Sequence, residues 1–158
     1  PDHLIMTNRE TGFVSQAMRR GLDIQCFVDP PSRGWKLPIK PPLSTDAVQH
    51  LVDQLLNASK RPTAIFAGAD SVAAVVYGSL ARRGIKVGDE ISVISGNNDH
   101  AFITGLYPQL TTFDIHAHDI GRLAVRQLET RLSMNNAIAN VDLTLEPHLT
   151  PGESVRQF

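Results

Sequence analysis

A strand–helix–strand pattern between residues 62 and 99 constrains the fold of this chain more than any other feature. The short apolar runs at residues 63–67 and 91–94 each predict a buried strand. Between them the sequence predicts a helix over residues 72–83, capped by Asp70 or Ser71 and ended by Gly84. Strands joined through a helix in this way are parallel, with the helix on one face of the sheet. The pattern therefore predicts an α/β fold.

Polar residues follow both of these strands. Asp70 comes after the first strand, and Asn97, Asn98 and Asp99 come after the second. Because ligands bind beyond the carboxyl ends of strands in open parallel sheets, these residues are candidates for a binding site. Two local roles compete with ligand contact. Asp70 could serve as the N-cap of the helix, and residues 97–99 could simply form a turn.

Arg9 is a further candidate. It lies at the start of a helix predicted over residues 9–20, the end at which the helix dipole favours a positive charge least. The side chain therefore either faces acceptor groups or is a solvated surface arginine. Gly12 lies in the first turns of the same helix, where glycine costs roughly 0.5–1 kcal/mol relative to alanine. Close approach of another backbone or of a ligand would explain it.

The next segment combines a short apolar run with a proline-rich stretch. Residues 24–28 are predicted to form a strand in which Cys26 is a buried thiol. Residues 29–43 carry five prolines, which exclude a helix or an inner strand and indicate a long extended loop. Trp35, within this loop, either stacks on a ligand or holds the loop against the domain.

The remaining elements follow from hydrophobic periodicity. Ser44 or Thr45 is predicted to cap a helix over residues 46–58. Strand-like segments are predicted at residues 110–115 and 141–145, with a helix over residues 119–132 between them. The tail from Thr150 is expected to be peripheral.

Composition and motifs exclude several classes of function. The net charge of −1 gives no basic surface for nucleic acid, and no apolar run is long enough to cross a membrane. A single cysteine excludes an intrachain disulfide, which fits the cytoplasm. His116 and His118 lie two residues apart without a third ligand at metal spacing, so no metal site is predicted. The sequence shows no phosphate-binding loop and no nucleophile–base pair, so we expect neither a cofactor nor an enzyme.

Several of these residues together resemble the effector-binding domain of the LacI/GalR family of transcriptional regulators. Arg9, Gly12 and Phe13 resemble the family's "RxxGF" element. The other matching positions are Pro62, Thr63, Ala64, Asp70, Ala73, Gly84, Val87, Ile91, Ser92, Val93, Leu110, Thr111, Thr112, Gly121, Ala124 and Leu128. The resemblance covers nearly the whole chain apart from the proline-rich loop, and it is specific as a combination of positions.

The resemblance implies the fold of the type I periplasmic binding proteins, in which two α/β lobes enclose a ligand cleft. Parallel-sheet layers would carry helices on both faces. Residues 1–110 would form the C-terminal lobe, with the loop at 29–43 as an insertion. Residues 111–140 would supply a crossover and a helix of the N-terminal lobe, and residues 141–158 a return strand and tail. The chain is then expected to be part of a longer protein.

The resemblance also implies a function and a site. The chain would be the ligand-sensing domain of a dimeric DNA-binding repressor that contacts DNA through a headpiece outside these residues. Arg9 and Asn97 would hold a small effector, such as a sugar, with Asp70, Asn98 and Trp35 nearby. Asn97 stands where the family has a carboxylate, and Ala69 stands where it has an amide. The alternative is a solute-binding protein of a sugar transporter, which shares the fold.

Overall fold

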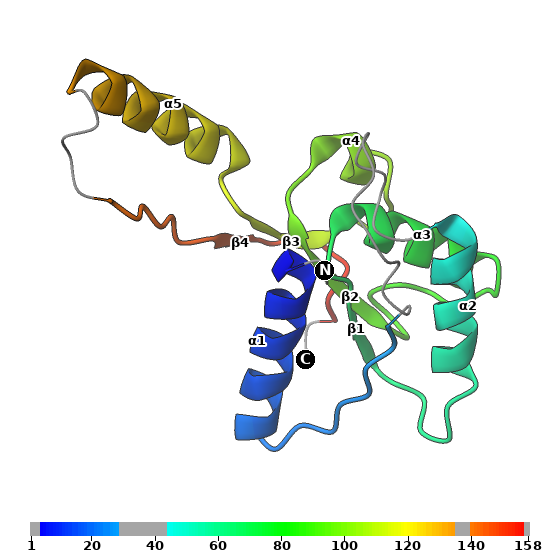
Figure 1. Cartoon of the computed structure of the whole chain (residues 1–158). Helices are drawn as coiled ribbons and strands as arrows, with labels where there is room; N and C mark the ends of the chain where they lie inside the picture. The colour runs from blue at the N-terminus through cyan, green and yellow to red at the C-terminus, as the bar shows by residue number, and fades with distance from the viewer. Residues whose placement is uncertain (1–3, 29–43, 135–139, 157–158) are drawn as a thin grey trace.

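The computed structural model describes residues 4–28, 44–134 and 140–156, so the proline-rich loop and Trp35 lie outside the described residues. Figure 1 shows the arrangement of the chain. The elements are α1 (Leu4–Arg19), α2 (Thr45–Leu56), β1 (Ala64–Phe66), α3 (Asp70–Ala81), β2 (Ser92–Asn97), α4 (His100–Ile103), β3 (Thr111–Asp114), α5 (Ala117–Ser133) and β4 (His148–Thr150).

The four strands form one sheet in the order β1-β2-β3-β4. β1 pairs with β2 and β2 with β3 in parallel, whereas β3 and β4 are antiparallel. The α/β fold and the strand–helix–strand unit predicted from the sequence are confirmed. The parallel strands β1, β2 and β3 end on the same side of the sheet, which brings the residues after β1 and β2 together.

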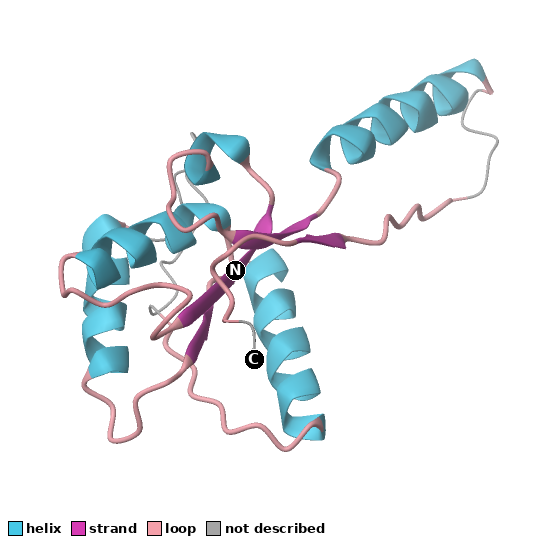
Figure 2. Cartoon of the chain, turned by 180° about the vertical axis from the view of Figure 1, so that it is seen from behind, coloured by secondary structure: helices cyan, strands magenta, loops and turns pink. Residues whose placement is uncertain are grey.

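Helices cover both faces of this sheet (Figure 2). Ile65 and Val93 belong to the buried core that the sheet forms with α2 and α3. Phe66, the next residue after Ile65, points to the opposite face because side chains alternate along a strand. There it stacks on Phe13 of α1, with ring centroids 4.7 Å apart and 9° between the ring planes. α1 therefore packs on the face that α2 and α3 leave open.

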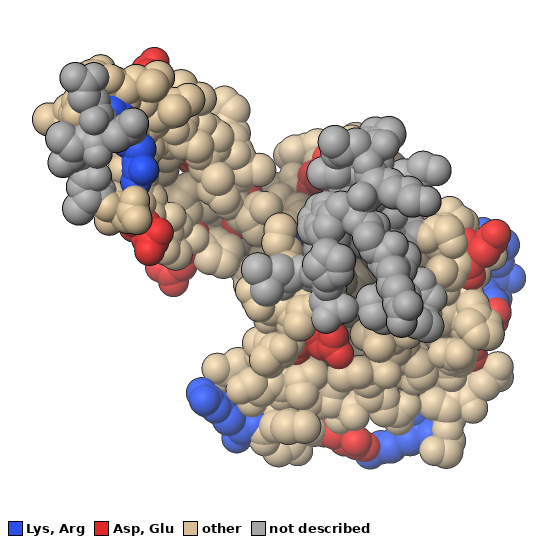
Figure 3. Space-filling model, viewed as in Figure 1, with Lys and Arg blue, Asp and Glu red and all other residues tan. Residues whose placement is uncertain are grey.

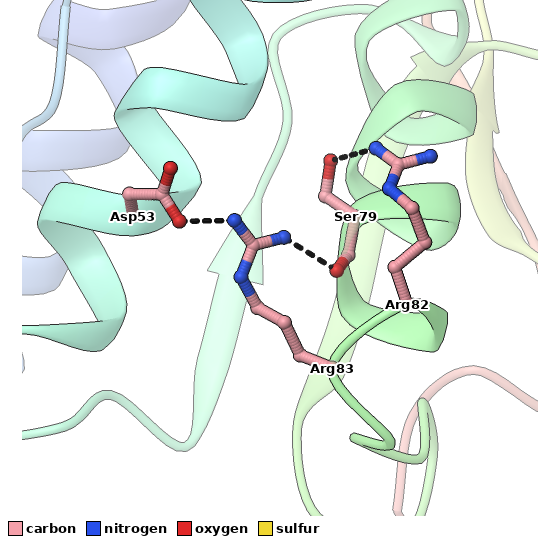
Figure 4. A network of polar contacts seen from close by, with 4 residues as sticks. All are labelled: Asp53, Ser79, Arg82 and Arg83. Atoms are coloured by element: carbon pink, nitrogen blue, oxygen red, sulfur yellow. Dashed lines mark hydrogen bonds and ion pairs between the residues drawn. The ribbon is translucent and has the colours of Figure 1, made fainter.

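Arg83 ties α3 to α2 (Figure 4). Its guanidinium contacts the Asp53 carboxylate of α2 and also donates to the Ser79 carbonyl of α3 at 2.8 Å. The second contact satisfies a carbonyl near the end of the helix, where a cation is favoured. Gly84 follows with φ +70, so the prediction that it ends this helix is confirmed. The hydroxyl of Ser44 accepts from the amide of Ala47, which confirms Ser44 as the cap of α2.

Two predictions for the N-terminal segment are wrong. α1 begins at Leu4 rather than near Arg9, because no helix-breaking residue interrupts the stretch before Arg9. Residues 24–28 form no strand. An apolar run becomes a strand only where a neighbouring strand pairs with it, and this one follows the surface, with Gln25 donating to the Lys60 carbonyl at 3.3 Å. Cys26 is consequently exposed, not buried.

The C-terminal segment also differs from its prediction. Residues 141–145 form no strand, and the strand lies at β4 instead. The tail beyond Thr150 is not peripheral, because Ser154 is fully buried between two strands of the sheet. Its hydroxyl donates to the Val93 carbonyl at 2.6 Å and accepts from the Thr111 amide at 2.8 Å. These contacts are remote in sequence, so local periodicity does not reveal them.

α5 stands apart from the rest of the molecule (Figure 1). It follows β3, and the chain returns through residues 140–147 to β4. None of its described residues is buried, and Ile120, Val125, Leu128 and Leu132 are all exposed. Within the described residues, no helix is both long enough and apolar enough to cross a membrane. Charged side chains are dispersed in small groups of both signs over the face in Figure 3.

Candidate functional site

Arg9 joins the carboxyl ends of β1 and β2. Its Nη1 donates to the carbonyl of Gly68, just after β1, at 2.6 Å, and its Nη2 donates to Oδ1 of Asn97, the last residue of β2, at 2.8 Å. Arg9 and Asn97 are 88 positions apart in the sequence. We call the group of Arg9, Gly68, Asn97 and Asn98 the polar edge.

The packing of α1 on the sheet positions Arg9. Phe13, one turn beyond Arg9 on the same helix face, stacks on Phe66 of β1. At the start of the helix, a Cβ on Gly68 would lie 3.2 Å from Sδ of Met6, so glycine permits this close approach. No other backbone approaches Gly12, because apart from the backbone of its own helix no described atom lies within 4 Å of where its Cβ would be. The tight contact is at Gly68 instead.

Two opposing effects act on the pKa of the Arg9 guanidinium. Partial burial lowers the pKa of the guanidinium, and attraction to the Asp70 carboxylate partly opposes that change. An arginine remains charged in proteins at physiological pH. Because Asn97 is neutral, Arg9 meets an amide oxygen rather than a carboxylate at the surface. The polar edge therefore presents a half-buried cation with uncharged side-chain partners.

Asp70 lies beneath the polar edge rather than at its surface. Its side chain is 0% exposed and accepts hydrogen bonds from the hydroxyls of Ser95 and Thr112 and from the Asp99 amide. The bond to Thr112 is 2.8 Å long and that to the Asp99 amide 2.7 Å. Asp70 therefore connects the carboxyl ends of β2 and β3 to the start of α3. Its carboxylate is enclosed by protein donors and does not face an incoming ligand in this structure.

The prediction that Asp70 or Ser71 caps α3 is wrong. The N-cap is Ala69, which offers no side-chain hydrogen bond, and Asp70 is the first residue of the helix. A carboxylate is still favourable in the first turn because of the helix dipole. Nothing local marks Asp70 as a buried residue. Ser95 of β2 and Thr112 of β3 are polar residues that the sheet buries, and they were the sequence signal for such a network.

Asn97 and Asn98 turn the chain at the end of β2. Their φ angles are 133 and 56, both positive, and that of Asn98 lies in the left-handed region that asparagine tolerates better than most residues. The Asp99 carboxylate accepts from the Ala101 amide at 3.1 Å and caps α4. Asn97 is the last residue of β2, and Asn98 and Asp99 lead from it into α4, so residues 97–99 do not form a simple turn. Both asparagine side chains make longer-range contacts, because Asn97 contacts Arg9 and Asn98 donates to Asp114 at 3.1 Å.

A second group of polar side chains lies near the polar edge, and the sequence spacing did not indicate it. Asp114, His116 and His148 place one potential ligand atom each within 4.8 Å of one another. Hydrogen bonds from the His116 amide and the Asn98 side chain lower the pKa of Asp114. His118, by contrast, is 93% exposed. A further hollow of about 950 Å³, lined in part by Tyr77 and Glu153, contains none of the predicted site residues.

The fold and this polar edge together define an α/β domain whose polar side chains gather beyond the ends of parallel strands. The periplasmic binding protein-like domain family matches residues 1–155, and the chain belongs to this family. The resemblance to LacI/GalR regulators noted in the sequence is confirmed by the relatives of the chain.

Known relatives are regulators of transcription. The ribose operon repressor of Haemophilus influenzae is 31% identical over 104 residues, which span 66% of this chain and 31% of that protein. Among solved structures, a LacI family transcriptional regulator from Bifidobacterium animalis has a TM-score of 0.74 and 22% identity. The match covers 95% of this chain and 50% of that one.

A third relative is a solved complex of the transcriptional regulator CelR with cellobiose. Its TM-score is 0.75 at 20% identity, and the match covers 94% of this chain and 42% of that one. At such identities the solved structures establish the fold alone. The chain thus spans about a third of the length of the ribose operon repressor and about half or less of the solved chains.

Proposed function

We propose that this chain is part of the ligand-sensing domain of a transcriptional repressor and that a small effector, a sugar or related polyol, binds at the polar edge. The observation that carries the proposal is the bridge that Arg9 makes between Gly68 and Asn97 at the carboxyl ends of two parallel strands. That location is where open α/β sheets bind ligands.

The polar edge has hydrogen-bonding capacity to spare. A guanidinium has five N–H donors, and the two described bonds engage one donor on each terminal nitrogen of Arg9. The Asn97 amide retains its NH₂ donors, because its oxygen is the atom that meets Arg9. Neighbouring hydroxyls of a polyol offer both donors and acceptors to such a pair. Each hydrogen bond to the charged guanidinium contributes about 1.5–3 kcal/mol.

The names of the relatives support a sugar over other small molecules. One relative is the repressor of a ribose operon, and another was solved in complex with cellobiose. Those ligands belong to those proteins, and they set the first compounds to test here. Because the relatives are regulators of transcription, they favour a sensor over the solute-binding alternative and over an enzyme.

The division into lobes is part of the proposal. Residues 1–110 would form the C-terminal lobe, residues 111–140 a crossover and one helix of the N-terminal lobe, and residues 141–158 the return. The isolated position of α5, with its apolar face uncovered, supports this division. The effector would then lie between the lobes, with the polar edge as one wall.

We expect the effector to act by changing how the two lobes meet. Such a change would alter DNA-binding headpieces carried by another part of the protein, in a homodimer in the cytoplasm. Dimer contacts would come from α3 and from residues 102–106, where Phe102 is 43% exposed. DNA contact lies outside this chain, in keeping with its net charge of −1.

Calorimetric titration of the full-length protein with ribose and with cellobiose tests this function. We expect at least one of the two sugars to bind, and Arg9→Ala to weaken binding by about 10–100-fold, because it removes hydrogen bonds from a charged donor. The matched control is Arg19→Ala, an exposed arginine on the same helix, which should leave affinity unchanged. If Arg9→Ala and Arg19→Ala both leave the affinity for the sugar unchanged, the polar edge is not the effector site.

A further inference from the structure

The register of β3 and β4 places a histidine directly opposite an aspartate. Asp114 is the last residue of β3, and in this antiparallel pair its partner is His148, the first residue of β4. Residues opposite each other in an antiparallel pair direct their side chains to the same face of the sheet, with Cβ atoms about 4.5–5.5 Å apart. His116 follows Asp114 by two residues, before α5 begins.

The three side chains converge. Nδ1 of His148 and Nε2 of His116 lie 3.1 Å apart, and the ring centroids are 4.8 Å apart. With an oxygen of Asp114, all three potential ligand atoms lie within 4.8 Å of one another. His116 reaches this position in a left-handed backbone conformation, with φ 56 and ψ 43, which a non-glycine residue adopts uncommonly.

The distances suit a metal ion with tetrahedral coordination. Zinc binds imidazole nitrogen at about 2.0–2.1 Å, so two such ligands of one tetrahedral ion lie roughly 3.3 Å apart. The two imidazole nitrogens are already 3.1 Å apart, and an oxygen of Asp114 lies within 4.8 Å of both. Two histidines and one carboxylate are ligands that zinc accepts, and three protein ligands leave a coordination position for water.

Neighbouring groups orient the carboxylate. Oδ1 of Asp114 accepts from the His116 amide at 2.7 Å, and Oδ2 accepts from the Asn98 side chain at 3.1 Å. Each carboxylate oxygen has two acceptor positions, so both keep one free. Supporting hydrogen bonds of this kind are typical around metal ligands, where they fix the ligand geometry.

We propose that Asp114, His116 and His148 form a binding site for a divalent transition-metal ion of the zinc class. The site joins the end of β3 to the start of β4, the two segments through which the chain leaves the sheet for α5 and returns. A bound ion thus ties these two segments together at the base of α5. The site rests on its own geometry and does not depend on which effector the polar edge takes.

Calorimetric titration with Zn²⁺, on full-length protein without a histidine tag, tests the site. Loss of a residue that only supports a metal ligand weakens metal binding by about 10–100-fold. We expect His148→Ala, which removes a ligand itself, to weaken zinc binding by more than that. His118→Ala is the matched control, because His118 is near in sequence but 93% exposed and outside the cluster, and it should bind like the wild type. Asp114→Asn, which keeps the size of the side chain, should lose binding as His148→Ala does.

Thermal unfolding with and without Zn²⁺ gives a second measure. Zinc that binds the folded state should raise Tm in the wild type and in His118→Ala, and not in His148→Ala. Absence of zinc binding in the wild type would overturn the site. Equal affinity in the His148→Ala and His118→Ala variants would also overturn it, because the ion would then be held elsewhere.

Discussion

α3 and α5 are both helices that carry several apolar residues, yet they differ completely in burial. α3 packs between α2 and the sheet, and six of its residues are buried, including Leu80 at 0% exposure. α5 has no buried residue, and Leu128 on its apolar side is 58% exposed. The difference shows that the sequence can predict a helix with apolar residues, while the burial of those residues depends on a packing partner. The described residues supply that partner for α3 and not for α5.

The same substitution in the two helices gives the largest contrast. Leu80→Ala should lower the free energy of unfolding by about 2–5 kcal/mol, because it opens a cavity in the core. Leu128→Ala should change the stability of this 158-residue chain by less than about 0.5 kcal/mol, because its side chain has little packing to lose. Urea unfolding of the chain measures both. A large cost for Leu128→Ala would mean that α5 is packed in solution.

A pair of serines sharpens the comparison with a smaller effect. Ser154→Ala should cost about 1–3 kcal/mol, because the buried hydroxyl bridges the Val93 carbonyl and the Thr111 amide. Ser133→Ala in α5 removes an exposed hydroxyl that donates to the Glu129 carbonyl of its own helix, so we expect a change within about 0.5 kcal/mol. Equal costs in urea unfolding would show that the tail is not built into the sheet.

Tyr77, on the packed helix α3, should make the stability of the folded chain depend on pH in the alkaline range. Burial raises the pKa of Tyr77 to about 12, and the nearby Ser154 lowers it by a smaller amount. The Tyr77 hydroxyl donates to the Pro108 carbonyl at 3.1 Å. In the unfolded chain the hydroxyl titrates near 10.0, so between these values the folded state keeps a proton that the unfolded state has lost. Stability is therefore full below pH 10 and falls as the pH rises toward 12.

Tyr77→Phe should remove this part of the alkaline loss. Urea midpoints measured from neutral to alkaline pH check the prediction. Tyr107→Phe is the control, since Tyr107 is 89% exposed and is the other of the two tyrosines in the chain. If the two variants lose stability in parallel above pH 10, Tyr77 is not the group responsible.

The local sequence pattern was sufficient to predict the strand–helix–strand unit. The apolar runs at residues 63–67 and 91–94 and the helix-ending Gly84 are local signals, so the strand–helix–strand unit was predictable. β4 was not, because it exists by pairing with β3 rather than by its own composition. The prediction of a buried Cys26 was wrong for the converse reason. Its segment is apolar in sequence, but no neighbouring strand pairs with it.

The residues of the candidate site were also predictable from the sequence only in part. Arg9 and Asn97 were named together only through the family resemblance, and the structure brings them into contact across 88 positions. Their role toward an effector stays a prediction. Asp70 was named for its place after a strand, but its 0% exposure follows from Ser95 and Thr112, which lie on other strands. His148 joined His116 and Asp114 only through strand register.

A crystal structure of the full-length protein with ribose or cellobiose bound tests the central claim most directly. The account predicts sugar hydroxyls within hydrogen-bond distance of the Arg9 guanidinium and the Asn97 amide, beyond the carboxyl ends of β1 and β2. A sugar bound elsewhere, with the Arg9–Asn97 contact intact and no ligand atom near it, would contradict the account.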